Sequence, residues 1–352
     1  MFEKDKMMIF PRMVSVGHGV IADVGKICSE LGLSGTGLVI TGGTTSDLAG
    51  NTVAEVIKAE GFGAVMHITG SATLESVELA VDAGKKAKAG FVLGVGGGSK
   101  IDVAKLVATE LKKPFISIPT SAAHDGIASP RASIKNDIGS VSREAVSPLG
   151  IIADTGIIMK SPYRLLASGC GDALSNLTAV KDWELAKKLR NEEYSSFAAV
   201  LSKTAAQIIL DSAGSIKPGI EESVWLVAKA LIVSGVSMSI ANSSRPTSGA
   251  EHMFSHALDK IANAPALHGE QVGVGTIMMM YLHGGDWMKI KEALKRIGAP
   301  TTAKDLGVTD EQIVRALMMA HEIRKDRYTI LGEGGLTKEA AENLAHITGV
   351  IS

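Results

Sequence analysis

The sequence predicts an α/β fold in which a Rossmann-like parallel-sheet domain is followed by an all-helical domain, with the active site in the cleft between them. Strand-like and helix-like segments alternate up to Ser161, and only helical patterns follow it. Gly is abundant (39 residues) and aromatic residues are scarce (4%), as in chains with many tight strand-to-helix turns. At 352 residues the chain also exceeds the length of about 250–300 at which one core stops growing. We therefore predict two domains, 1–161 and 162–352.

The first domain is predicted to contain a parallel sheet. Strand and helix in alternation require right-handed crossovers, which place successive strands parallel to one another. The polar segment 127–148 predicts a hairpin flap before the last strand. The predicted strands are 37–40, 64–68, 91–93, 115–119 and 151–154, and helices are expected to begin near Ser46, Leu74 and Lys100.

The second domain is predicted to be helical throughout. It opens at Pro162, a residue favoured at first helical positions. Residues 224–241 form the most apolar stretch, but Lys229 and several serines within it favour a buried helix over a bilayer span. The predicted helices are 164–189, 194–213, 221–241, 248–261, 271–281 and 337–351.

Composition limits the classes of function. A net charge of -1 with 21% charged residues argues against a nucleic-acid surface, an acidic tail and disorder, so a small-molecule partner is expected. Cys28 and Cys170 are the only cysteines, which suits a reducing compartment. The first residues carry charge and no apolar core of a signal peptide. We expect a cytoplasmic protein with no membrane insertion.

A glycine-rich turn lies between a predicted strand and a predicted helix. At such a turn backbone N–H groups and the helix dipole can bind a phosphate. It is not a P-loop, because Ser99 precedes Lys100. The alternative is an ordinary strand-to-helix turn with Ser99 as N-cap. The residues predicted to bind a dinucleotide here are Gly96, Gly97, Gly98, Ser99, Lys100, Ile101 and Asp102.

A second candidate binding loop is 119–126. Its small and hydroxylated residues follow the carboxyl end of another predicted strand, where open α/β sheets bind ligands. The alternative is an ordinary loop rich in Ser and Thr.

One carboxylate and three imidazoles are candidate metal ligands. His252 and His256 are four residues apart and so share one face of a helix. His268 begins a further predicted helix, and Asp172 has small neighbours. Such ligands suit zinc or a similar divalent ion acting as a Lewis acid. The alternatives are an N-cap role for Asp172, a hydrogen-bonded core position for His256 and a surface position for His268; Cys170 is expected to fill a small packed space.

Taken together, three motifs carry a family resemblance. They are Gly-Gly-Gly-Ser-Lys at 96–100, Thr-Ser-Ala-Ala-His-Asp-Gly-Ile-Ala-Ser at 120–129 and Glu-His-Met-Phe-Ser-His at 251–256. The chain resembles the superfamily of glycerol dehydrogenase, iron-type alcohol dehydrogenase and dehydroquinate synthase nearly from end to end. Further matching segments run from Phe10-Pro11-Arg12 to residues 268–273.

The resemblance implies a role for each candidate residue. NAD or NADP would contact Gly98 to Asp102 and the second loop, and one divalent metal, most readily zinc, would be held by Asp172, His252 and His268. The substrate would contact Asp125, Asp172 and His256, with His256 close to the metal without ligating it. The second-loop residues implied in cofactor binding are Thr120, Ser121, Ala122, Ala123 and Ser129.

The implied reaction is reversible hydride transfer between a nicotinamide and the secondary carbon of glycerol 1-phosphate, with dihydroxyacetone phosphate as the ketone. It would supply the glycerophosphate backbone of ether phospholipids. Alternatives are a dehydrogenase of glycerol or another polyol, a dehydroquinate synthase, and a regulatory protein that binds a nucleotide without chemistry. A homo-oligomer is expected.

The sequence also offers candidate residues for cofactor choice and for binding of the substrate phosphate. Thr41-Gly42-Gly43 has no carboxylate to repel a 2′-phosphate, which predicts use of both NAD and NADP. For the substrate phosphate, the cations nearest in sequence to the predicted site are Lys160, Arg164 and Arg245.

Overall fold

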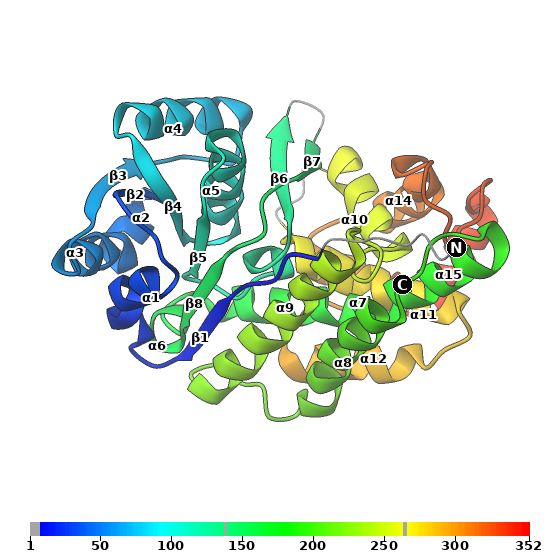
Figure 1. The fold of residues 1–352 in the computed structure, drawn as a ribbon. Coiled ribbons are helices and arrows are strands. Elements are labelled where there is room, and N and C mark those ends of the chain that lie inside the picture. The colour runs from blue at the N-terminus through cyan, green and yellow to red at the C-terminus, as the bar shows by residue number, and fades with distance from the viewer. Residues whose placement is uncertain (1–7, 137–138, 263–265) are drawn as a thin grey trace.

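A six-stranded parallel sheet forms the first half of the molecule, and helices form the second (Figure 1). The computed structural model describes residues 8–136, 139–262 and 266–352. The strand order is β1-β8-β5-β4-β2-β3, and the described chain has no strand after β8. The predicted fold class is therefore confirmed. The strands are β1 (Met13–Gly17), β2 (Thr36–Thr41), β3 (Gly63–Ile68), β4 (Ala89–Gly96), β5 (Phe115–Pro119) and β8 (Gly150–Asp154).

Strand β1 was not among the predicted strands. It pairs with β8 at the edge of the sheet, with Met13 opposite Gly150. Its side chains are only partly covered, and Val14 is exposed. A short edge strand with an incompletely buried face lacks the continuous apolar run on which the other strands were predicted.

Helices cover both faces of the sheet. Helices α1 (Val24–Glu30) and α3 (Asn51–Ala59) pack on one face, where Val39 points, and α4 (Leu74–Lys86) and α5 (Gly98–Leu111) pack on the other, with Leu38 and Ile40. This alternation along β2 is that of a strand buried on both sides. Short helical turns, α2 (Gly43–Thr45) and a π-turn (Ser46–Gly50), precede α3, so regular helix begins later than predicted.

The predicted flap is a β-hairpin. Strands β6 (Arg131–Asn136) and β7 (Gly139–Glu144) are antiparallel. In Figure 1 the hairpin stands between α5 and α10 (Ala250–Ile261), and it contacts both helices, β6 touching α5 and β7 touching α10. It therefore links the sheet region to the helical region.

The helical region follows a short turn, α6 (Thr155–Ile158). Pro162 is the N-cap of its first helix rather than a helical residue. The segment between α11 and α15 was predicted to be helical without any helix being located in it, and it contains three. Asp286 caps α12, and Gly298 ends it with a left-handed backbone. The remaining helices are α7 (Tyr163–Arg190), α8 (Ser196–Ser212), α9 (Glu221–Ala241), α11 (His268–Leu282), α12 (Trp287–Ile297), α13 (Ala303–Leu306), α14 (Asp310–Ile323) and α15 (Lys338–Ile347).

Helix α9 lies inside the helical region. Within the described residues it is the one helix long and apolar enough to cross a membrane, but 72% of its apolar window is buried in the fold. The same core includes residues of the sheet region such as Ile127 and Ile151. The hydrophobic core therefore continues across the predicted boundary at 161/162, which stays a prediction.

Candidate active site

The glycine-rich turn lies where the direction of strand order reverses. The chain leaves β2 outward to β3 but leaves β4 in the other direction, to β5. Ligands of open α/β sheets bind beyond the carboxyl ends of the strands at such a point. The loops after β2 and β4 are in contact there, because a Cβ added to Gly42 would lie 2.5 Å from Lys100 Cε. The crevice for a dinucleotide is thus set by topology.

The turn itself exposes backbone donors at the start of a long helix. Gly97 is the N-cap of α5 and makes no side-chain capping bond, so Ser99 is not the N-cap of the alternative interpretation. The first N–H groups of an α-helix have no intrahelical partners and carry the positive end of its dipole. Gly98 also lies against His124, since a Cβ added there would be 1.8 Å from His124 Nε2. The imidazole thus fills the side-chain space of Gly98, while the N–H groups of Gly98 and Ser99, at the first two positions of α5, can bind an anion.

The other predicted residues of this turn differ in what they offer. Lys100 donates through Nζ to the Gly70 carbonyl, and Ile101 is buried in the sheet core. Asp102 accepts a bond from the Ser133 amide (3.1 Å) and thereby anchors the hairpin. These three side chains therefore hold the turn in place. A cofactor would contact mainly the backbone of the turn.

The second loop packs beside the turn. The Thr120 amide donates to the Gly96 carbonyl (3.0 Å), which fixes one loop to the other. Ser121 and Ala122 are buried, and the Ala123 carbonyl accepts a bond from Ser168 (3.2 Å). Ser129 is also buried and lines the large cavity described below. Both predicted binding loops thus lie at one edge of the sheet.

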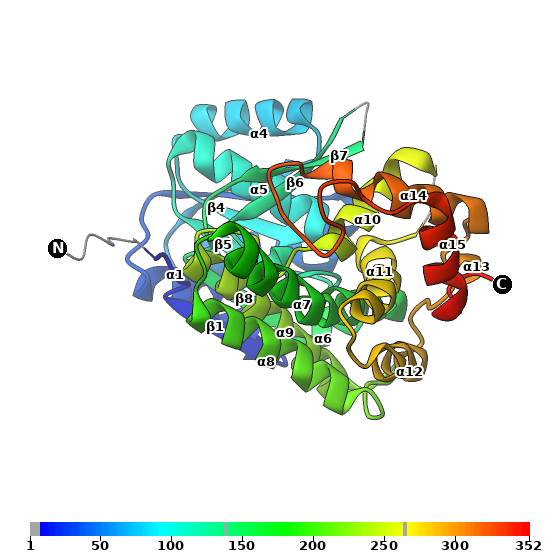
Figure 2. The same cartoon turned by 90° about the vertical axis from the view of Figure 1, so that its right-hand side faces the viewer.

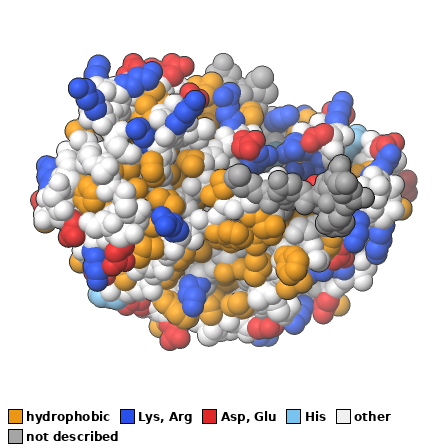
Figure 3. Space-filling model, in the orientation of Figure 1, with side chains coloured by type: hydrophobic (Ala, Val, Ile, Leu, Met, Phe, Trp, Pro, Cys, Tyr) orange, Lys and Arg blue, Asp and Glu red, His pale blue; other side chains and the backbone are white. Residues whose placement is uncertain are grey.

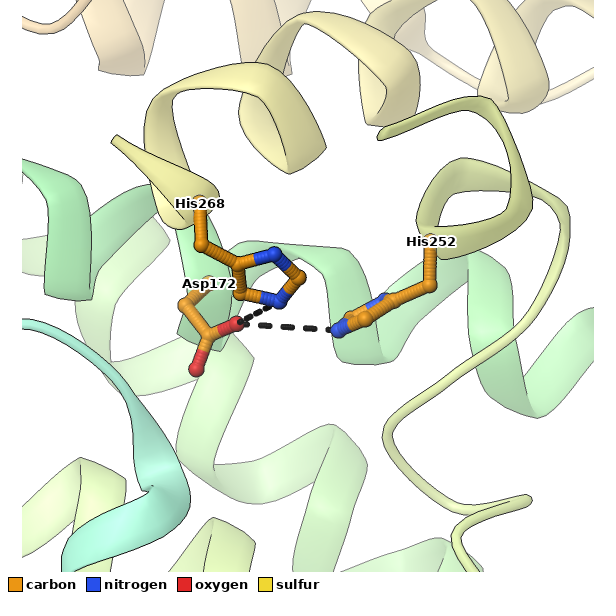
Figure 4. A group of neighbouring side chains, drawn as sticks. All are labelled: Asp172, His252 and His268. Atoms are coloured by element: carbon orange, nitrogen blue, oxygen red, sulfur yellow. Dashed lines mark ion pairs between the residues drawn. The ribbon is translucent and has the colours of Figure 1, made fainter. Parts of the chain in front are cut away.

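Asp172, His252 and His268 point into one space (Figure 4). Asp172 Oδ1 lies 3.7 Å from His252 Nε2 and 3.8 Å from His268 Nε2. Each residue comes from a different helix: α7, α10 and α11, respectively. Asp172 is in the middle of α7 and 3% exposed, so it is not an N-cap.

This geometry fits a divalent metal. The three ligating atoms lie within 4.8 Å of one another. Two ligands of a tetrahedral zinc ion, each about 2.0–2.2 Å from it, are separated by roughly 3.5 Å, close to the distances found here. One carboxylate and two imidazoles also leave a coordination position open, as in catalytic sites.

Neighbouring groups orient both imidazoles. His252 Nδ1 lies 3.0 Å from Glu251 Oε1, and His268 Nδ1 lies 3.4 Å from Ser255 Oγ. Glu251 is itself held by Thr178 Oγ1 (2.8 Å). Such partners fix the ring orientation of metal-ligating histidines. Sequence reasoning missed Glu251, although its place beside His252 in the 251–256 motif was a usable signal.

Glycines bring together two of the helices that carry candidate metal ligands. A Cβ on Gly171 of α7 would lie 2.2 Å from the carbonyl oxygen of Gly269 on α11, and a Cβ on Gly269 would lie 2.0 Å from the Ser168 carbonyl oxygen. Asp172 and His268 are the immediate neighbours of these glycines. The close backbone approach therefore sets the distance between two of the candidate ligands.

Asp125 and His256 flank the metal-ligand group. The Asp125 amide donates to Asp172 Oδ2 (2.8 Å), and burial together with the Asp172 charge raises the pKa of the Asp125 carboxyl to about 7. The His256 ring stacks on His268 with centroids 5.8 Å apart, and its buried Nδ1 has no partner among the described residues, unlike a hydrogen-bonded core histidine. Burial and nearby positive charges lower the pKa of His256 to about 4, so it is a neutral imidazole.

One cavity of about 820 Å³ joins these features. Ser99 and Asp102 line it from the sheet side, and Asp172, His252 and His268 line it from the helical side. Buried Cys170 lies outside its lining and fills packed space, as predicted.

The basic residues of this cavity are not those predicted for the substrate phosphate. Arg164 pairs with Glu270 (2.6 Å) and Arg245 with Glu192, and neither they nor Lys160 line the cavity. The basic residues that line it are Arg131, Lys135, Lys260, Arg324 and Arg327. The cations chosen by nearness in sequence thus do not line the cavity, whereas the segment after α14 reaches it from far along the chain.

Comparison with known proteins agrees with this fold. Residues 15–162 match the iron-containing alcohol dehydrogenase family. The crystal structure of glycerol dehydrogenase from Schizosaccharomyces pombe superposes with a TM-score of 0.81 at 20% identity, covering 98% of this chain and 91% of that one. The first half of the chain thus matches an oxidoreductase family, and the whole chain has the fold of glycerol dehydrogenase.

Curated relatives narrow the class further. Glycerol-1-phosphate dehydrogenase (NAD(P)+) from Methanosarcina barkeri is 56% identical over 99% of this chain and 97% of its own length. The enzyme of that name from Methanothermobacter thermautotrophicus is 57% identical over 97% of this chain and 98% of its own. This chain belongs to the glycerol-1-phosphate dehydrogenase family.

Proposed function

We propose that this chain reduces dihydroxyacetone phosphate to sn-glycerol 1-phosphate with NADH or NADPH and a divalent metal, most readily zinc. The product would enter phospholipid synthesis, and we assign the enzyme to the cytoplasm. The observation that carries the proposal is the shared cavity, onto which both the glycine-rich turn and the group Asp172, His252 and His268 open. The family's name supplies the substrate.

The cavity has room for a nucleotide's reactive end and a small ketone together. Asp172, His252 and His268 would hold the metal, and Gly98 and Ser99 would hold the cofactor's phosphates through their backbone N–H groups. When bound, the nicotinamide supplies the hydride and the metal polarises the ketone oxygen.

The chain's own residues would orient the ketone and handle the proton. Asp125, whose Oδ2 accepts a bond from Ser234 Oγ (2.9 Å), is positioned beside Asp172. With a pKa of about 7, its carboxyl can hold or release a proton near neutrality. His256 Nδ1, buried without a partner in the described chain, can bond a substrate hydroxyl.

The proposal predicts a specific ketone and tolerance of both cofactors. Purified protein supplied with zinc should oxidise NADH and NADPH when dihydroxyacetone phosphate is added, and chiral analysis should find sn-glycerol 1-phosphate. Because the loop Thr41-Gly42-Gly43 has no carboxylate to repel a 2′-phosphate, kcat/KM for the two cofactors should agree within about tenfold.

Dihydroxyacetone is the control substrate in this assay. Faster turnover of dihydroxyacetone than of its phosphate would favour a polyol dehydrogenase, and the sn-3 product would refute the assignment. Strict use of NAD alone would contradict only the prediction that the enzyme uses both cofactors.

A homo-oligomer remains part of the proposal. Figure 3 shows hydrophobic side chains gathered over β1, α8 and α9 on one face. The exposed apolar residues on these elements include Val14, Phe197, Val200 and Trp225. An extended apolar surface of this kind is typical of a subunit contact.

A further inference from the structure

Two of the three arginines that line the cavity, Arg324 and Arg327, come from the segment between α14 and α15, and the third, Arg131, lies on β6. This segment, orange-red in Figure 2, returns past α10, against which α14 packs. Arg327 reaches the loop before α10, where it donates to the Ser248 carbonyl (2.6 Å) and to Ser244 Oγ (2.9 Å). Ser244 and Ser248 line the same cavity.

The charge of Arg327 is not neutralised by a carboxylate partner. Arg324 makes two bonds to Asp326 (3.1 and 3.0 Å), and Arg245 is paired with Glu192. Arg327 bonds only neutral oxygens, and within the described ranges no carboxylate forms an ion pair with it. Arg327 is half-buried, and a half-buried guanidinium without a carboxylate partner gains from pairing with an anion.

Neighbouring positive charges further favour the binding of an anion at Arg327. Burial and the positive charges of Arg324 and Arg245 lower the pKa of Arg327 to about 9. The charges of Arg324, Arg327 and Lys260 also act on His256, whose ring stacks on His268. His256 thus adjoins the candidate metal ligand His268 and lines the same cavity as these cations.

We propose that Arg327, supported by Arg324 and the hydroxyl group of Ser244, binds the phosphate of the substrate. This inference rests on the proposed function and names the residues that would distinguish a phosphorylated ketone from an unphosphorylated one. In dihydroxyacetone phosphate only a methylene and an ester oxygen separate the ketone carbon from phosphorus. The ketone would face Asp172, His252 and His268 while the phosphate passes His256 to reach the guanidinium.

The cofactor's phosphates would bind at a different part of the cavity from the phosphate of the substrate. The glycine-rich turn lies on the sheet, at the carboxyl end of β4, whereas Arg327 is fixed to the loop between α9 and α10 in the helical region. The glycine-rich turn would therefore bind the cofactor's phosphates, and Arg327 would bind the phosphate of the substrate. Arginine also suits a phosphate better than lysine does, because its fork can bond two oxygens.

The test compares Arg327→Gln and Arg327→Lys with the control Arg296→Gln, which changes an exposed arginine of α12. The readout is kcat/KM for dihydroxyacetone phosphate divided by that for dihydroxyacetone. We expect Arg327→Gln to lower this ratio on the order of 10- to 100-fold, as the loss of a charged hydrogen bond to phosphate would. Arg327→Lys should lower it less, and Arg296→Gln should leave it unchanged.

Inorganic phosphate provides a second readout. It should compete with dihydroxyacetone phosphate in the wild-type enzyme, and its inhibition constant should rise at least about tenfold in Arg327→Gln. If that variant does not fold, Arg327→Lys decides, since a lowered ratio supports the inference and a wild-type ratio overturns it.

The outcomes also separate this inference from the function. A wild-type enzyme that turns over dihydroxyacetone phosphate, together with folded variants that lose activity on both substrates equally, would overturn the role of Arg327 alone. A wild-type enzyme without that turnover would overturn the proposed function itself.

Discussion

Replacing Asp172 by Asn should remove bound metal and lower kcat/KM for dihydroxyacetone phosphate by about 10³-fold or more. The amide keeps an oxygen for the Asp125 N–H but loses the charge that faces His252 and His268. A metal acting as a Lewis acid contributes several kcal/mol to transition-state stabilisation, which corresponds to this factor. Metal content per subunit and initial rates measure the two effects.

The fold should survive this change. Asp172 is buried, and burial raises the pKa of its carboxyl, so a neutral amide of the same shape removes a desolvation cost. Asp211→Asn, at an exposed position on α8, is the matched control and should keep full metal content and activity. Full metal content in Asp172→Asn would show that this carboxylate is not a ligand.

Replacing Gly171 by Ala should destabilise the protein and weaken metal binding together. The new Cβ would lie 2.2 Å from the Gly269 carbonyl oxygen and 3.5 Å from Gly273 Cα, so α7 and α11 would have to move apart. Overpacking of this kind costs about 1–3 kcal/mol in the free energy of unfolding. Because Asp172 and His268 adjoin the contact, their separation should grow and metal affinity should fall, which thermal unfolding and metal titration would reveal.

Gly214→Ala is the control for that experiment. A Cβ at Gly214 meets no atom within 4 Å, so stability and metal affinity should stay near the wild-type values. Equal metal affinity in Gly171→Ala and Gly214→Ala would mean that the close approach of α7 and α11 does not position the ligands.

Local patterns predicted much of this fold because its strands and longest helices carry strong signals. Helix α9 begins at Glu221 and ends at Ala241, as the apolar run between them predicts. The edge strand β1 was missed because its burial is partial. Helix α12 was missed although buried Ile290, Leu294 and Ile297 follow helical spacing, since its surface residues are mostly charged.

The site was less accessible to sequence reasoning. Spacing placed His252 and His256 on one helical face but could not choose between them, and Asp172 joins His252 only because α7, α10 and α11 pack together. The resemblance, not the spacing, separated His256 from the metal ligands. Arg327 could not be found by nearness in sequence, because its contacts with Ser244 and Ser248 exist only in the folded chain.

The most direct test of the account is the rate of NADPH oxidation with dihydroxyacetone phosphate before metal removal, after chelation and dialysis, and after zinc is returned. The account predicts activity in the first sample, a loss of at least about 10³-fold in the second and recovery near one zinc ion per subunit in the third. Undiminished activity in the chelated enzyme, with metal analysis showing none bound, would contradict it.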